Sequence, residues 1–167
     1  VRKPDEIPNI FHDLKPVKGA VSGVKSLEND YDLYVLSTAP WYNNSSWQDK
    51  IFWIQKYFGY EKDSPFYKHV ILTHNKGFIN LPDSVLVDDR PYHGASDWDD
   101  AQNHRVWLQY GYDPRLVWQG KLAAFLKDAA FEFRKNGDLR SSIINVAKNG
   151  NYSIHGDKHL FKKNDWE

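Results

Sequence analysis

The sequence predicts an α/β protein in which helices cover both faces of a parallel β-sheet, a three-layer sandwich. Short, almost uninterrupted apolar runs recur along the chain, for example at residues 69–72 and 84–87. Such runs are typical of parallel strands buried on both faces, because a strand with one solvated face alternates apolar and polar residues. Segments with helical spacing separate the runs, as the crossover connections of parallel strands require.

The first half of the chain contains two predicted helices on either side of one predicted strand. Three prolines make residues 1–18 a loop with at most a short helical turn. Over residues 19–30 apolar side chains recur every three or four positions, which predicts a helix. Residues 33–36 are a dense apolar strand. A second helix is expected from Ser45 to just before Gly59, because serine caps helix starts and glycine commonly ends helices.

The second half continues the pattern as far as Gly137. Further strands are predicted at residues 69–72, 84–87 and 105–108, and a helix at residues 122–133. After Gly137 the chain is more polar, and Asn149-Gly150 favours a hairpin turn between residues 143–146 and 152–154. A partly disordered tail is the alternative. We therefore predict three segments: a leading loop (1–18), a core (19–137) and a polar C-terminal extension (138–167).

Composition limits the classes of function. With 167 residues, 41% of them apolar and 26% charged, the chain is an ordinary globular protein. A formal net charge of zero argues against binding to a nucleic-acid polymer or an acidic membrane. The chain contains no cysteine and no membrane-length apolar stretch, so a cytoplasmic protein is expected, with a homodimer as a candidate assembly. His74, His93 and His104 lack zinc-site spacing and are interpreted as polar loop residues.

Polar side chains follow three of the predicted strands. Thr38 follows the first strand, Lys76 follows the second, and Asp88 and Asp89 end the third. Because the carboxyl ends of parallel strands line one crevice, a hydroxyl, a cation and two carboxylates are expected there, the groups that phosphoryl transfer and a magnesium ion require. Each also has an ordinary interpretation. The threonine could belong to a turn or a helix cap, the lysine could lie on the surface, and the two aspartates could form a solvated acidic turn.

Four stretches together resemble the haloacid-dehalogenase-like (HAD) phosphohydrolases, and among them the 5'(3')-deoxyribonucleotidases, the cytosolic type C nucleotidases. The matching stretches, in the order and approximate spacing of the family, are residues 7–16 with Gly19-Ala20 following, 35–41, 71–76 and 86–91. The resemblance covers roughly residues 7–110. It implies a Rossmann-like sheet, a Mg²⁺ cofactor and a small-molecule nucleoside monophosphate as substrate.

The resemblance also implies roles for individual residues. Thr38 and the backbone of Ala39 would bind the substrate phosphate. Lys76 would neutralise the phosphate and the attacking carboxylate. Asp89 would be a direct magnesium ligand, and Asp88 would hold the lysine or a metal-bound water. Thr38, Lys76 and Asp88 are thus the candidate catalytic residues of this chain.

The leading loop falls where the family shapes its nucleoside pocket. The resemblance makes residues 1–18 a remnant of the cap or substrate loop, with Phe11, His12 and Asp13 in contact with the nucleoside. A phenylalanine there would stack on a base. Ordinary loop packing is the alternative for these three residues.

One part of the family pattern is missing. The family carries its nucleophilic aspartate in an Asp-x-Asp motif after the central strand, whereas Asp30-Tyr31-Asp32 precedes a strand here. The sequence also lacks methionine. We therefore expect the first central strand and the nucleophile to lie upstream of Val1. The alternatives are a truncated or degenerate domain that binds a phosphorylated ligand or partner without catalysis, and a phosphatase for another small phosphomonoester.

Overall fold

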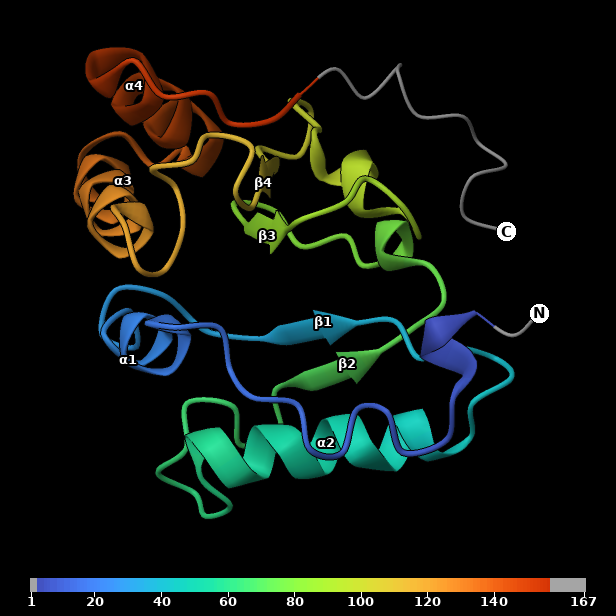
Figure 1. The fold of residues 1–167 in the computed structure, drawn as a ribbon. Coiled ribbons are helices and arrows are strands. Elements are labelled where there is room, and N and C mark those ends of the chain that lie inside the picture. The colour runs from blue at the N-terminus through green and yellow to red at the C-terminus, as the bar shows by residue number, and fades with distance from the viewer. Residues whose placement is uncertain (1–2, 157–167) are drawn as a thin grey trace. The chain divides into compact units, whose positions relative to one another are not determined.

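The computed structural model describes residues 3–156, which form two compact units that divide between His74 and Asn75 (Figure 1). Each unit is built around its own pair of strands. None of the described helices is long and apolar enough to cross a membrane.

The first unit contains a parallel pair of strands and two helices. Strand β1 (Val35–Ser37) pairs with β2 (Val70–Leu72), with Val35 opposite Val70. Helix α1 (Ala20–Lys25) contacts helix α2 (Ser45–Phe58), which ends at Gly59 as predicted. Gly59 has a φ of 103°, a conformation that favours glycine. The loop that joins β1 to α2 begins at the carboxyl end of β1, where Thr38 lies.

The leading loop lies along α2, as Figure 1 shows for the blue segment that follows the short 3₁₀ helix η1 (Pro4–Glu6). Buried Asn43 donates from its Nδ2 to the carbonyl oxygens of Asp5 and Ile7, at 2.9 and 3.0 Å. Farther along α2, the indole N–H of Trp53 donates to the carbonyl oxygen of Leu14 at 2.6 Å. These side-chain hydrogen bonds satisfy backbone acceptors that a loop leaves open, and they fix the loop on the helix.

The second unit contains the other strand pair and two long helices. Strand β3 (Val85–Asp88) pairs in parallel with β4 (Val106–Gln109). Short 3₁₀ helices η2 (Lys76–Phe78) and η3 (Ala95–Trp98) contact each other, and η3 contacts both strands. Helix α3 (Leu122–Asn136) packs against helix α4 (Leu139–Gly150). The fully buried large side chains of this unit are Trp107, Leu108, Leu116, Leu122 and Ile143.

Helix α4 replaces the hairpin expected near Asn149-Gly150, so that prediction is wrong. Asp138 caps the helix, since its Oδ1 accepts the backbone N–H of Ser141 at 2.9 Å. Buried Leu139, Ile143 and Ala147 then recur every four residues and share one face. The Asn149-Gly150 pair lies in the last helical turn, before Asn151 in the left-handed conformation. Residues 157–167 lie outside the described part of the chain.

The predicted α/β class is confirmed, and both described strand pairs are parallel. The four expected apolar runs correspond to β1–β4 within one or two residues at their ends. Among the described residues, β1 and β3 each pair with a single strand. An additional central strand stays a prediction, as does the division of the chain at residues 18 and 137.

Candidate functional site

Thr38 and Ala39 lie at the carboxyl end of β1, where a phosphate-binding hydroxyl was expected. The Oγ1 atom of Thr38 is buried, and it has no hydrogen-bond partner within the described part of the chain. Ala39 is fully buried. A buried hydroxyl without a partner is costly, because it has lost its hydrogen bonds to water. A ligand oxygen that accepted from Thr38 would remove this cost.

Lys50 also reaches this end of β1, although no pattern in the sequence predicts it. From the second turn of α2, its Nζ donates to the Oγ of Ser37 at 3.0 Å and to the carbonyl oxygen of Thr38. The same ammonium group lies 4.7 Å from the centroid of the Phe11 ring. The structure thus brings Phe11 and a cation to the strand end that carries Thr38. Lys50 reaches the end of β1 because of the way α2 packs beside that strand. The spacing of residues in the sequence does not predict this packing.

His12 and Asp13, the other two predicted nucleoside contacts, lie on the outside of α2. The ring of His12 stacks on Phe52, with centroids 5.1 Å apart and planes 9° apart. Its Nδ1 is 2.9 Å from Oδ1 of Asp13, and the Asp13 side chain is exposed. These contacts are those of a loop packed on a helix. A role for Phe11, His12 and Asp13 in nucleoside binding stays a prediction.

In the second unit, the structure brings Lys76 and Asp88 together in an ion pair between Nζ and Oδ2. Both side chains are largely buried, with exposed fractions of 11% and 13%. Backbone hydrogen bonds fix the lysine from two sides: its N–H donates to the His93 carbonyl at 2.7 Å, and its carbonyl accepts from the Trp98 indole at 3.0 Å. The second carboxylate oxygen of Asp88 accepts the backbone N–H of Arg90 at 3.2 Å.

Asp89 has different surroundings from its neighbour, because its side chain is 66% exposed. Partial burial of the carboxyl group and the charge of Asp88 both raise the pKa of Asp89, whereas Arg90 lowers it. The Nε atom of Arg90 lies 3.8 Å from Oδ1 of Asp89. Because Lys76 neutralises Asp88, Asp89 is the exposed carboxylate of the pair, and an exposed carboxylate is a suitable ligand for a hard divalent cation, so Asp89 fits Mg²⁺.

Gly94 shapes the loop that positions Lys76. Gly94 has a φ of 81°, and a Cβ atom there would lie 2.1 Å from the Oδ1 of Asn75 and 2.4 Å from the N of Gly77. That same Asn75 oxygen accepts the backbone N–H of Gly77 at 2.9 Å and caps η2. The loop around Gly94 and the start of η2 therefore approach more closely than any residue with a side chain would allow.

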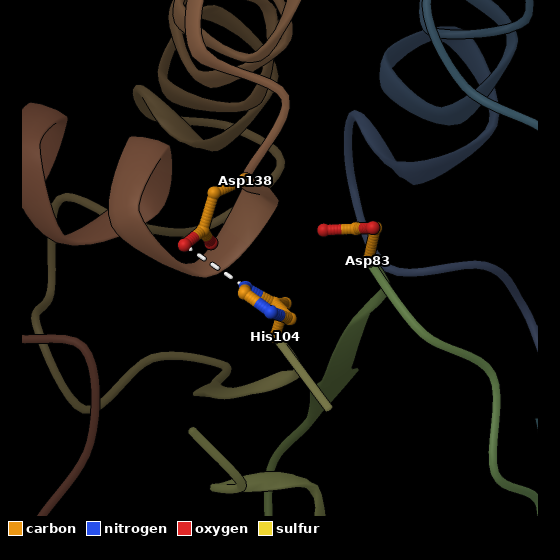
Figure 2. Close-up of side chains that lie close together, drawn as sticks. All are labelled: Asp83, His104 and Asp138. Atoms are coloured by element: carbon orange, nitrogen blue, oxygen red, sulfur yellow. Dashed lines mark ion pairs between the residues drawn. The ribbon is translucent and has the colours of Figure 1, made fainter. Parts of the chain in front are cut away.

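A separate group of polar side chains, Asp83, His104 and Asp138, converges at the start of α4 (Figure 2). The Nδ1 of His104 lies 2.9 Å from the Oδ2 of Asp138. Asp83 accepts the backbone N–H of Leu139 at 3.2 Å, while Asp138 accepts that of Ser141. Because both carboxylates serve N–H groups in the first helical turn, the group is best described as a cap of α4.

Comparison with known proteins finds relatives for about half of the chain. No family model matches the chain. Over 94 residues the chain is 44% identical to a putative 5'(3')-deoxyribonucleotidase of Vibrio phage KVP40. The aligned part is 56% of this chain and 52% of the phage protein. It is 30% identical over 103 residues to a putative 5'(3')-deoxyribonucleotidase of Acanthamoeba polyphaga mimivirus, covering 54% of this chain and 44% of that protein.

A human protein shows the same relationship. The chain is 33% identical over 89 residues to the mitochondrial 5'(3')-deoxyribonucleotidase of Homo sapiens, covering 52% of this chain and 36% of the human protein. The chain thus spans about half the length, or less, of the curated relatives it matches. Over that part it is similar to proteins named 5'(3')-deoxyribonucleotidase, the family that its four motifs resemble.

Proposed function

We propose that this chain carries the phosphate- and cation-binding residues of a magnesium-dependent phosphomonoester hydrolase that acts on nucleoside monophosphates. The observation that carries the proposal is the arrangement at the end of β3, where a buried lysine neutralises Asp88 and the adjacent Asp89 stays exposed. The names of the homologous proteins support the substrate class.

In the first unit, the proposed role is recognition of the phosphate. The buried hydroxyl of Thr38 and the backbone N–H of Ala39 would donate to phosphate oxygens. Donors that are already in place stabilise developing charge without reorganisation, which is the largest source of rate enhancement in many transfer reactions.

In the second unit, the proposed role is neutralisation of charge. Lys76 would face the phosphoryl oxygens, and Asp88 would hold its ammonium group in position through their ion pair. Asp89 would hold Mg²⁺, with Asp88 beside it. When bound, the ion would neutralise negative charge on the phosphoryl group.

The nucleophile of the proposed reaction is an aspartate upstream of Val1. Its carboxylate oxygen would attack phosphorus, the bond from phosphorus to the ester oxygen would break, and the leaving nucleoside oxygen would take a proton from the second aspartate of the same upstream Asp-x-Asp motif. Water would then hydrolyse the aspartyl-phosphate to inorganic phosphate. In the sequence of this chain, none of the segments β1–β4 is followed by Asp-x-Asp.

The second candidate is a domain that binds a phosphorylated ligand without turnover. This candidate is favoured because the proposed binding groups are present, whereas none of the described strands of this chain is followed by an Asp-x-Asp motif. The coding DNA upstream of Val1 separates the two candidates. An in-frame apolar strand followed by Asp-x-Asp-Gly would favour the enzyme, and a stop codon there would favour the binding domain.

The proposal is tested by calorimetric titration of the chain with a panel of ribo- and deoxyribonucleoside monophosphates, with and without Mg²⁺. We expect binding that Mg²⁺ strengthens, and a loss of about tenfold or more in affinity for Thr38→Val and for Lys76→Ala, because each removes a hydrogen bond to a charged group. Ser22→Ala and Lys148→Ala are matched controls at exposed positions and should bind as the parent does. Failure of every monophosphate to bind, or equal losses in the controls, would refute the proposal.

A further inference from the structure

Aromatic side chains gather beside Thr38 in the first unit, and two of them are unusually exposed. Trp41 and Tyr42 follow Thr38 by three and four residues, and they are 74% and 80% exposed. By contrast, Trp107 is fully buried in the core of its own unit. A tryptophan that leaves most of its surface in water loses the stabilisation that burial normally supplies. Its exposure therefore needs an explanation outside the folding of this unit.

His74 fixes the position of the exposed indole. Its imidazole centroid lies 5.8 Å from that of Trp41, and the edge of Trp47 contacts it from another direction at 5.6 Å. His74 thus contacts both tryptophan rings, while Trp41 stays 74% exposed. We call Trp41, Trp47 and His74 the aromatic cluster.

The aromatic cluster and Thr38 lie at the same edge of the β1–β2 pair. Ser37 is in register with Leu72, and the N–H of Thr73 donates to the carbonyl oxygen of Ser37 at 3.0 Å. The residues that follow, Thr38 on one strand and His74 on the other, therefore leave the pair at its carboxyl edge. Trp41 is only three residues from Thr38, a distance of at most about 10 Å along an extended backbone.

We propose that Trp41, held by His74, stacks on the base of the nucleoside monophosphate whose phosphate Thr38 binds. This inference rests on the proposed function and assigns the part of the ligand beyond the phosphate. A nucleobase is flat and aromatic, so it can stack on an exposed indole ring. Such stacking tolerates different bases because every base has a π-face. The aromatic cluster would then supply affinity for a nucleotide over a sugar phosphate.

The test compares three ligands in calorimetric titrations: thymidine 5'-monophosphate, 2-deoxyribose 5-phosphate and inorganic phosphate. Trp41→Ala should weaken binding of the nucleotide by about 5- to 100-fold. It should leave the affinities for deoxyribose phosphate and inorganic phosphate unchanged. Trp41→Phe keeps a stacking face and should retain most of the nucleotide affinity. Tyr60→Ala removes another aromatic ring of the same unit, 70% exposed, and should alter none of the three affinities.

The outcomes separate this inference from the proposed function. If the chain binds none of the three ligands, both are wrong. If it binds all three and Trp41→Ala changes none of the affinities, or lowers all of them equally, only the role of Trp41 is wrong. Sedimentation of the same variants tests the alternative that a second copy of this chain binds at Trp41. A parent dimer that Trp41→Ala dissociates, with nucleotide affinity unchanged, would make the aromatic cluster a self-association surface and overturn the inference.

Discussion

Lys76 pairs with Asp88 and not with Asp89, although the two carboxylates are adjacent at the end of β3. Asp88 is 13% exposed and bonded to the lysine, whereas Asp89 is 66% exposed and lies 3.8 Å from Nε of Arg90. The two acids therefore have different surroundings despite their position in one dipeptide. In the proposed function Asp88 serves the lysine, and Asp89 is left for the cation.

Breaking the Lys76–Asp88 pair should destabilise the second unit. Lys76→Met keeps much of the side-chain volume but leaves Asp88 with an uncompensated buried charge, which costs about 3 kcal/mol of unfolding free energy. Adding Asp88→Asn removes that charge, and the amide oxygen can still accept the N–H of Arg90. The double variant should recover most of the loss in urea denaturation. If the double variant were as unstable as the single one, the unpaired charge would not be the cause.

Asp89→Asn should weaken Mg²⁺ binding without harming the fold. Removal of a direct ligand should lower Mg²⁺ affinity by at least about tenfold, since loss of a supporting contact alone costs that much. The pKa of Asp89 is raised, so its charge opposes folding once the pH exceeds that raised pKa. The metal-free variant should therefore unfold at a slightly higher temperature than the parent at pH 7.

The control for this variant is Asp128→Asn, which removes a carboxylate from an exposed position on α3. It should leave Mg²⁺ affinity unchanged in the same calorimetric titration. A metal affinity that is equal in the parent and in Asp89→Asn would place the cation elsewhere.

The ion pair between Asp100 and Arg105 should contribute stability that acid removes. Asn103 and Arg105 donate to Oδ2 of Asp100 at 2.7 and 2.9 Å, and these bonds lower the pKa of Asp100 from 3.8 to about 2. A lowered folded-state pKa means stability that is complete above the ordinary value and lost as the pH falls. The urea midpoint of the parent should fall more steeply than that of Asp100→Asn between pH 3.8 and about 2. Parallel curves would contradict this assignment.

The strand ends were predictable from the sequence because buried parallel strands have a simple signature. An apolar run followed by polar residues located Thr38, Lys76 and Asp88 correctly at or beyond the ends of β1, β2 and β3. Lys50 was missed because its contact with Thr38 depends on the packing of α2, which a linear pattern does not record.

The error at α4 has a different cause. Ile143, Ile144 and Val146 are β-branched, and with Asn149-Gly150 they favour a hairpin locally. The competing signals were the cap at Asp138 and the four-residue spacing of the buried face. They prevail because α4 packs on α3, and such tertiary contacts override local preference.

Gly94→Ala should disturb the loop that holds Lys76 more than a comparable change elsewhere. The new Cβ would lie 2.1 Å from the Oδ1 of Asn75, so η2 must shift, and the φ of 81° adds a backbone cost of about 1 kcal/mol. Gly137→Ala is the matched control, because its φ is 72° and a Cβ there meets nothing within 4 Å. We expect a larger loss of stability for Gly94→Ala in urea denaturation, together with shifted amide resonances at Lys76 and Gly77. Equal losses in the two variants would show that backbone conformation, and not the close approach of the two loops, requires glycine at position 94.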